Sequence, residues 1–349
     1  MNINLYNAQL ENLYIHKVGN RARNEQLFLS QEPYELNDEI RPLLKEFFLK
    51  PFREKDLQFH KFSEESTIQS LFGKRQIFED EGDFVPPNKI HEAIAYHLYS
   101  CGNHPHIKTG ELYICKIENI LINNEKVFAI GIFKSEVKQE FIQFEQKETR
   151  LDAILKEGVN LNKLDKGAII TLEEEPRVLF IDSNRYDTKY WIEDFLGVEE
   201  MEDSDFHTKK YLKFCENFAK DVVRPAEDKQ QEIMFMNRAV NHFASHDEFQ
   251  EDSFLNEVLE NPELVPEFSN YKAEKGAKYK IEDLTEFPIS NTAVTTVQKK
   301  LKSLINLDTN IQIKLNFINP ESAEKFIEKG WDDERQMYYY LVYFNKEEK

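Results

Sequence analysis

The sequence predicts an α+β protein with two domains: an N-terminal domain, residues 1–186, built on an antiparallel sheet with helices, and a mainly helical C-terminal domain, residues 187–349, ending in a small strand pair. The chain has 349 residues, and single cores seldom grow beyond about 250–300 residues. Apolar residues alternate with polar ones mainly in the first part, and recur every three or four positions mainly in the second.

The first strands and the first helix are expected near the start of the chain. Alternating apolar residues predict strands over 3–16 and 26–30. A helix is expected to begin at Asn37 or Asp38, because either side chain can accept hydrogen bonds from amides of the first turn. Its apolar residues form one stripe, and Pro51 is expected to end it.

Two further helices precede the main run of strands. One begins at Ser63-Glu64-Glu65-Ser66, and the other follows Pro86-Pro87-Asn88. From Glu111 the apolar period becomes two, and Asn123-Asn124-Glu125 is typical of a hairpin turn. The expected strands form an antiparallel meander over 112–117, 127–133, 141–144, 168–172 and 178–181.

The C-terminal domain is expected to be mainly helical until its last segments. Apolar residues keep helical spacing to about residue 304 and then alternate, and the final segment is rich in Tyr, which favours strands. The expected helices cover 206–219, 233–243, 252–260, 263–275 and 294–304, and the expected strands cover 311–317 and 337–344, around a helix at 320–329.

Composition indicates a folded protein of the cytoplasm. Hydrophobic residues make up 40% of the chain and aromatic residues 13%, which is enough for packed cores. No apolar run reaches the roughly 18–20 residues that cross a bilayer, and the first residues lack the pattern of a secretory signal. The three cysteines, Cys101, Cys115 and Cys215, form no C-x-x-C pair, so reduced thiols are expected.

The formal net charge of −19 comes from 64 acidic and 45 basic residues and is partly regional. Residues 171–205 hold twelve acidic residues against Arg177, Arg185 and Lys189. Such a surface repels phosphate, so it is expected either to face solvent or to bind a basic protein partner. The candidate partner-binding residues are Glu199, Glu200, Glu202 and Asp203.

The sequence contains no recognisable catalytic motif. Its 11 scattered glycines form no phosphate-binding loop, and it has no G-x-S-x-G elbow, H-E-x-x-H helix or EF-hand loop. Paired carboxylates such as Glu64-Glu65 and Asp332-Asp333 are explained by helix starts and loops. We therefore expect a protein that is not an enzyme, with no catalytic residue and no cofactor.

Two groups of histidines could bind a metal by their chemistry, but their spacing does not give a complete set of metal ligands. His97, Cys101, His104 and His106 are close in sequence, yet the segment also fits a polar turn between a helix and a strand. Elsewhere, two histidines four residues apart can lie on one side of a helix, with acidic neighbours but no third ligand of obvious placement; they are His242 and His246, followed by Asp247 and Glu248. No metal is assigned, and convergence of the first group stays open.

Basic residues form local islands in this acidic chain. One island lies on an expected amphipathic helix, where lysines on the polar side can contact phosphates without reading bases. The alternative is that the lysines only keep the helix soluble. The candidate DNA-binding residues are Lys209, Lys210, Lys213, Lys272, Lys275, Lys299, Lys300 and Lys302, and Lys74-Arg75 forms a further island.

The order of segments resembles the bacterial nucleoid-associated NdpA family, also called the YejK type. No segment is a catalytic signature, and the resemblance depends on their shared order along nearly the whole chain. The segments are Leu13-Tyr14-Ile15-His16-Lys17, Leu27-Phe28-Leu29, Phe62-Ser63-Glu64-Glu65-Ser66, Val127-Phe128-Ala129-Ile130-Gly131, Trp191–Gly197, Tyr271-Lys272-Ala273-Glu274-Lys275-Gly276 and Ile313–Phe317.

The resemblance implies a non-enzymatic role at the nucleoid and possible contact with topoisomerase-type proteins that manage chromosome topology. We therefore expect binding to double-stranded DNA without sequence specificity through a local basic face, association with such a protein, or both. The alternative is an acidic module that docks a basic partner and does not bind DNA directly. A metal-dependent hydrolase is a third hypothesis, without a convincing ligand set. The expected location is the cytoplasmic nucleoid, and a homodimer is possible.

Overall fold

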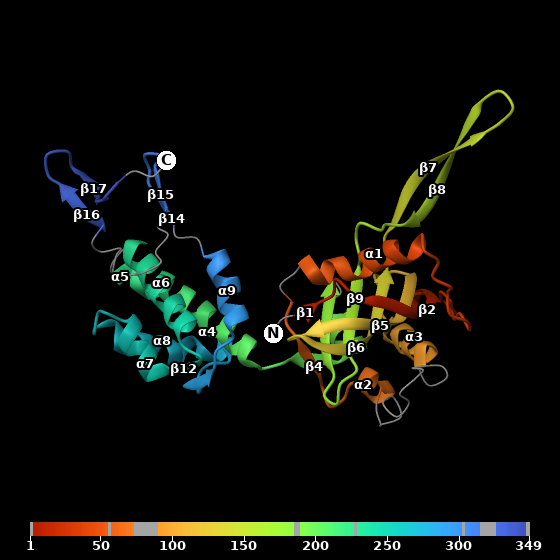
Figure 1. The fold of residues 1–349 in the computed structure, drawn as a ribbon, viewed down its shortest axis with the longest axis horizontal. Coiled ribbons are helices and arrows are strands. Elements are labelled where there is room, and N and C mark those ends of the chain that lie inside the picture. Colours follow the sequence, from red (N-terminus) through yellow and green to blue (C-terminus); the bar gives the residue numbers. More distant parts are fainter. Residues whose placement is uncertain are drawn as a thin grey trace. The chain divides into compact units, whose positions relative to one another are not determined.

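The computed structural model describes residues 3–54, 57–72, 90–184, 189–226, 229–301, 304–314 and 326–346. The chain divides into two compact units, Asn2–Met201 and Glu202–Lys349. The first is built on an antiparallel sheet, and the second is mainly helical and ends in small strand pairs (Figure 1). The predicted α+β class is confirmed.

Nine described strands form the sheet of the N-terminal unit. Their order is β11-β4-β10-β9-β6-β5-β2-β3, and β1 pairs with β5. Every pairing in this sheet is antiparallel. The strands are Ile3–Asn4 (β1), Gln9–Val18 (β2), Leu27–Phe28 (β3), His60–Phe62 (β4), Gly110–Ile122 (β5), Glu125–Ser135 (β6), Lys166–Thr171 (β9), Arg177–Asp182 (β10) and Val198–Glu200 (β11).

Asparagines shape the long central strands. Asn123 and Asn124 have φ angles of 51° and 70° and form the turn between β5 and β6, as predicted. Asn12 and Asn119 have φ angles of 48° and 58°, and the strand registers shift beside them. Asn tolerates the left-handed conformation better than most residues, so these positions allow the strands to bulge and twist.

Helix α1 (Ile40–Glu54) covers one face of the sheet. Its Phe48 stacks on Phe133 of β6, with ring centroids 4.4 Å apart. Asn37 Oδ1 accepts a hydrogen bond from Ile40 N at 2.8 Å, so the predicted start of the helix holds. The predicted end at Pro51 is wrong, because the helix continues to Glu54. Phe52, buried against Phe133, anchors this last turn, and its packing offsets the hydrogen bond that proline cannot donate.

The opposite face is covered by α2 (Thr67–Phe72), α3 (Ile90–Cys101) and a π-helix, η2 (Lys189–Leu196). Trp191 and Phe195 of η2 are fully buried among residues of these helices and of the sheet. The first helical segment after residue 187 therefore packs into the core of the N-terminal unit. The predicted helices that begin near Ser63 and after Asn88 correspond to α2 and α3.

Strands β7 (Lys138–Gln146) and β8 (Leu151–Val159) pair with each other and form a separate hairpin. Figure 1 shows this hairpin extending beyond the sheet of its unit. The prediction that 141–144 belongs to the main meander is therefore wrong. In the sheet, β6 pairs directly with β9 instead. Apolar alternation identified the strand but not its partner, because a two-stranded arm and a central strand share the same period.

The C-terminal unit buries an aromatic-rich core among its helices. Tyr211 and Phe214 of α4 contact aromatic residues of neighbouring elements, and both are fully buried. No described helix is both long and apolar enough to cross a membrane. The helices are α4 (Ser204–Phe218), η3 (Ala219–Val223), α5 (Arg224–Ala226), α6 (Lys229–Ser245), α7 (Glu251–Val258), α8 (Leu264–Tyr279) and α9 (Asn291–Lys300), and β12 (Glu248–Gln250) pairs with β13 (Glu286–Pro288).

The last described segments form two strand pairs. Strand β14 (Leu304–Asn306) pairs with β15 (Gln312–Lys314), and β16 (Ile327–Asp332) pairs with β17 (Met337–Val342). The helix expected over 320–329 is wrong from Ile327 onward, where β16 begins; Phe326 is helical, and residues 320–325 lie outside the described residues. The three tyrosines and the valine of β17 favour a strand.

Candidate functional site

Two of the predicted DNA-binding lysines form ion pairs along α4. Lys209 Nζ lies 2.8 Å from Asp205 Oδ2, and Asp205 also accepts a hydrogen bond from Ser290 Oγ at 2.8 Å. Lys213 Nζ lies 2.7 Å from Glu216 Oε2, and both side chains are partly open to solvent. Lys209 thus helps to join α4 to the start of α9, while Lys213 stays at the surface.

Lysines from two separate helices meet around one aromatic ring. Lys210 Nζ of α4 lies 4.8 Å from the centre of the Phe206 ring. Lys280, the C-cap residue that follows α8, lies 5.5 Å from the same ring. Lys280 Nζ also pairs with Glu202 Oε1 at 2.8 Å, in an exposed position. The fold therefore brings basic residues 70 positions apart into one surface region.

The predicted lysines of α8 have different environments. Lys272 is 7% exposed, and its Nζ lies 2.7 Å from Glu251 Oε1 and donates to Leu284 O at 2.9 Å. This geometry favours a role in joining α8 to its neighbours. Lys275 is exposed and pairs with Glu274 at 2.7 Å.

The lysines of α9 lie at its C-terminal end. Lys299 and Lys300 occupy the last turn and are exposed, where cations are favoured by the helix dipole. Val294 faces the core of the unit, as the amphipathic pattern predicts, but the expected end of this helix at Leu304 is wrong, because α9 ends at Lys300 and Leu304 begins β14. Lys302 and the island Lys74-Arg75 lie outside the described residues.

The four predicted partner-binding acidic residues are divided between the two units. Glu199 and Glu200 lie on β11, an edge strand of the sheet, and Glu199 pairs with Lys61 at 3.1 Å. Glu202 pairs with Lys280. Asp203 is the N-cap of α4, because its Oδ1 accepts a hydrogen bond from Phe206 N at 2.9 Å. Asp203 thus has a local structural role.

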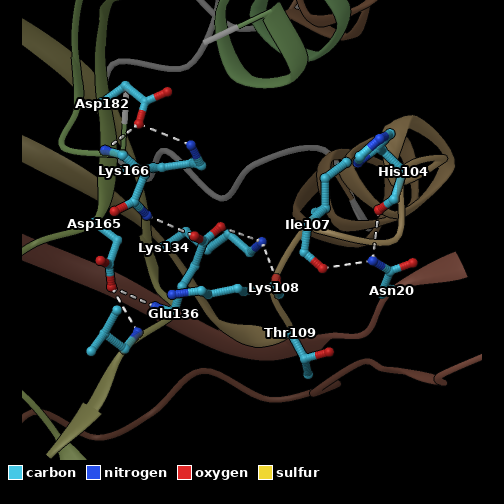
Figure 2. Close-up of polar contacts among 12 residues, drawn as sticks. Asn20, His104, Ile107, Lys108, Thr109, Lys134, Glu136, Asp165, Lys166 and Asp182 are labelled. Carbon is cyan, nitrogen blue, oxygen red and sulfur yellow. Dashed lines mark hydrogen bonds and ion pairs between the residues drawn. The ribbon is translucent and has the colours of Figure 1, made fainter. Parts of the chain in front are cut away.

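A buried charged network lies at one end of the sheet in the N-terminal unit (Figure 2). Lys134 and Lys166 are register partners on β6 and β9 and are fully buried. Lys134 Nζ lies 2.8 Å from Glu136 Oε1, and Lys166 Nζ lies 2.9 Å from Asp182 Oδ1. Burial lowers the pKa of Lys134 despite the nearby Glu136. Each ammonium has a carboxylate partner, as buried charges require.

Asp165 completes this network. Its Oδ2 accepts hydrogen bonds from the backbone amides of Glu136 and Val137, at 2.7 and 2.9 Å. Tyr190 of η2 lies over both lysines, with its ring centre 5.5 Å from Lys134 Nζ and 5.9 Å from Lys166 Nζ. The network joins the ends of strands to η2, and its tight pairing indicates a structural role.

The first predicted histidine group does not converge on a metal in the described structure. His97 has its Nε2 2.9 Å from Phe195 O, and Cys101 Sγ donates to Asp194 O at 3.3 Å. Burial raises the pKa of the Cys101 thiol to about 11, which disfavours the thiolate that metals bind. His104 and His106 stack on each other with ring centroids 5.0 Å apart.

The second histidine group gains a third potential ligand from another helix. Among the described residues, the group of three or more potential metal ligands is His242, His246 and Glu257. Glu257 belongs to α7, so sequence spacing gave no indication of it. Burial lowers the pKa of His242, although Glu257 opposes this effect.

The model of the family described as nucleoid-associated protein YejK matches residues 15–337 of the chain. The chain belongs to this family. No curated protein matches it. Membership of the YejK family gives the protein a nucleoid-associated role, and the match includes most of both compact units. The resemblance inferred from the order of segments is confirmed.

The buried network of this YejK family member was missed by sequence reasoning. A signal was present, since Lys134 ends the apolar run Phe128–Phe133 and Lys166 begins another, Gly167–Ile170. Charged residues beside buried strands are rarely fully buried unless they are paired. Glu136 is only two positions from Lys134, but the pairing of Lys166 with Asp182 depends on the register of β9 and β10, which spacing does not reveal.

Proposed function

We propose that this YejK family member binds double-stranded DNA without catalysis, through a lysine face formed by α4 and the end of α8. This α4–α8 lysine face comprises Lys210, Lys213, Lys278 and Lys280. The observation that supports it is the meeting of Lys210 and Lys280 at Phe206. The two helices are further joined because Asn217 Nδ2 donates to Tyr279 OH at 2.6 Å.

The lysines of this face can exchange their carboxylate partners for DNA phosphates, so the face is compatible with an acidic protein. Lys213 and Lys280 pair with Glu216 and Glu202 in exposed positions. Exposed ion pairs contribute little free energy, typically about 0–1 kcal/mol, so a phosphate can replace the carboxylate at small cost. Lysines act as point charges and do not read base edges in this arrangement. The proposal is therefore binding to the DNA backbone without sequence preference.

The described pocket of the C-terminal unit supports a role without catalysis. It has a volume of about 450 Å³ and is lined by residues that include Arg238 and Glu260. These two form an ion pair at 2.8 Å. No Cys, His or Ser is among the described residues of its lining, and its carboxylate, Glu260, is held in the ion pair with Arg238, so the described lining offers no Cys–His or Ser–His pair for nucleophilic catalysis.

A salt series with duplex DNA tests the lysine face. The variant Lys210→Glu/Lys280→Glu should bind more weakly than the wild type and lose affinity less steeply as salt rises, because each lost phosphate contact lowers the salt slope by roughly 0.9. The matched control is Lys126→Glu/Lys147→Glu, which makes the same charge change on exposed residues of the N-terminal unit. The control should keep the wild-type slope.

Two outcomes contradict the proposal. Equal salt slopes in the two double variants would rule out the α4–α8 face, and no binding at low salt would rule out direct DNA contact. In the second case a basic protein partner, such as one that manages chromosome topology, becomes the route to the nucleoid. Its capture should then weaken when Glu199, Glu200 and Glu202 are changed to Gln.

A second candidate function, self-association, is favoured by the β7–β8 hairpin. One face of the hairpin carries large apolar residues that are 60–66% exposed: Ile142, Phe144, Leu151 and Leu155. A two-stranded hairpin is only marginally stable alone in water, and such a face favours a protein contact. Residues 138–159 contain four basic and five acidic residues. The hairpin is thus nearly neutral, so two copies of a chain of charge −19 can meet there with little repulsion.

Sedimentation measurements test self-association. We propose that the wild type is a dimer and that Ile142→Asp/Leu155→Asp makes it a monomer, because paired carboxylates would oppose burial of this face. The control Glu140→Asp/Glu157→Asp keeps the hairpin charge on the same face and should remain dimeric. A monomeric wild type, or a dimeric Ile142→Asp/Leu155→Asp variant, contradicts this second proposal.

A further inference from the structure

Two histidines and a glutamate converge where α6 ends beside α7. His242 lies in the last turn of α6, His246 follows its last residue, and Glu257 lies on α7. One potential ligand atom from each lies within 4.8 Å of the others. His242 is buried, whereas His246 and Glu257 have side chains that are 40% and 48% exposed. The cluster therefore has a buried side and an open side.

Hydrogen bonding fixes the orientation and the tautomer of His246. Its Nδ1 lies 2.9 Å from His242 O. Because a carbonyl oxygen only accepts, Nδ1 carries the proton, and Nε2 of the neutral ring presents a lone pair. This Nε2 lies 3.7 Å from Glu257 Oε1. A backbone carbonyl that holds one ring nitrogen while the other faces a ligand position is the usual support of a metal-binding histidine.

The ring of His242 is fixed by its aromatic surroundings. It meets Phe254 edge to face, with centroids 5.3 Å apart. Its Nε2 is buried and has no hydrogen-bond partner among the described residues. Its Nδ1 lies 2.7 Å from Glu257 Oε2, so this nitrogen faces the open side of the cluster. Ser253 Oγ donates to Glu257 Oε1 at 2.9 Å and orients the carboxylate.

We propose that His242, His246 and Glu257 form a zinc-binding site. The ligand atoms are His242 Nδ1, His246 Nε2 and a carboxylate oxygen of Glu257, and the exposed side leaves a fourth position for water. Two imidazoles and a carboxylate suit Zn²⁺. Zn²⁺ takes the place of the proton between His242 Nδ1 and Glu257, and the proton of the neutral ring moves to the buried Nε2. The His242 ring packs against Phe243, Phe249 and Phe254, and aromatic rings accept N–H groups weakly.

The site would connect the end of α6 to α7. Direct repulsion between the two imidazoles is absent when both are neutral, and the carboxylate offsets part of the charge of the ion. Zn²⁺ bound by residues of two helices stabilises the folded state, because the unfolded chain does not keep the three ligands together. The inference is independent of DNA binding, since none of the three residues belongs to the α4–α8 lysine face.

Zinc binding to the untagged full chain tests the proposal, with a chromophoric chelator as competitor. The wild type should bind one Zn²⁺ and show a higher unfolding temperature with Zn²⁺ than without it. His246→Ala and Glu257→Gln should each reduce Zn²⁺ affinity by at least about tenfold and lose the Zn²⁺-dependent stabilisation. Glu257→Gln keeps the size of the side chain and an acceptor for His242, so it keeps the fold.

The matched control is His104→Ala/His106→Ala, which removes a stacked, exposed histidine pair from the N-terminal unit. This control should bind Zn²⁺ with wild-type affinity and stoichiometry. Loss of binding in the control, unchanged affinity in both cluster variants, or a wild-type stoichiometry far below one would overturn the proposal. Circular dichroism spectra that match the wild type confirm that each variant is folded when it is assayed.

Discussion

His16 is expected to make the N-terminal unit sensitive to mild acid. The side chain is 1% exposed, and its Nδ1 accepts a hydrogen bond from Ser30 N at 3.1 Å. The proton of the neutral ring therefore lies on Nε2, 3.3 Å from His91 Nδ1. A second proton would have to enter at Nδ1 and would break the bond from Ser30. Burial and the nearby His91 lower the pKa of His16 from 6.5 to about 4.

The size and sign of the effect follow from these two pKa values. Between pH 6.5 and pH 4 the unfolded chain binds the proton and the folded chain does not, so the free energy of unfolding falls as the pH falls. Above pH 6.5 the contribution of His16 is complete. The linkage relation gives a loss of about 2 kcal/mol between pH 7.5 and pH 5, and about 3 kcal/mol once the folded state is protonated.

Urea unfolding at several pH values measures this contribution. The chain has two tryptophans, and Trp331→Phe leaves Trp191, buried in the N-terminal unit, as the fluorescent reporter. In this background, His16→Asn supplies a side-chain oxygen near the position of Nδ1 but cannot titrate. Between pH 7.5 and pH 5, the free energy of unfolding should fall by about 2 kcal/mol more in the protein with His16 than in the His16→Asn variant. His106→Asn is the exposed control.

Comparing how the free energy of unfolding depends on pH in the parent protein and in the His16→Asn variant removes the effects of other titrating groups. Carboxylates that titrate in the same range act equally in both proteins, and any cavity left by asparagine is the same at every pH. Parallel pH profiles for the parent protein and its His16→Asn variant, diverging by less than about 0.5 kcal/mol, would refute the assignment of acid sensitivity to this imidazole. An equal change in the His106→Asn control would refute it as well.

Three other substitutions have defined expectations. Lys134→Met should lower the free energy of unfolding of the N-terminal unit by about 3–5 kcal/mol, because it leaves Glu136 buried without its cation. Adding Glu136→Gln to this variant should restore part of the lost stability. Losses that simply add in the double variant would contradict the pairing. Asp203→Ala should cost about 1 kcal/mol through the lost cap of α4, measured by thermal unfolding, and unchanged stability would contradict the capping role. Gly197→Ala should cost about 1–2 kcal/mol in urea unfolding, since Gly197 has φ +60° and a Cβ would lie 3.1 Å from Ser66; a stability gain would contradict this strain.

Local patterns predicted the elements better than their partners. Asn123 and Asn124 identified the β5–β6 turn, and Asn37 identified the start of α1, because both signals depend on the conformation and hydrogen bonding of a few adjacent residues. The pairing of β7 with β8 and the extension of α1 beyond Pro51 were not predicted. Both depend on which surfaces the segments contact after folding.

The lysine candidates show the same distinction. The sequence predicted both Lys210 and Lys272 as DNA-binding residues of basic islands. Folding places Lys210 with Lys280 at Phe206, whereas Lys272 is buried beside Glu251. Each lysine is exposed or buried according to the side of its own helix that it occupies, because successive residues are turned by about 100° around the helix axis.

By itself, the sequence determined that this protein is an α+β member of the YejK family with an acidic surface and local basic islands. Family membership and element type are carried by short segments and their order, which need no folded structure. Only the tertiary structure brought His242 and His246 to Glu257, and Lys166 to Asp182. Ligand geometry and charge pairing act over a few ångströms in space, whatever the separation of the residues along the chain.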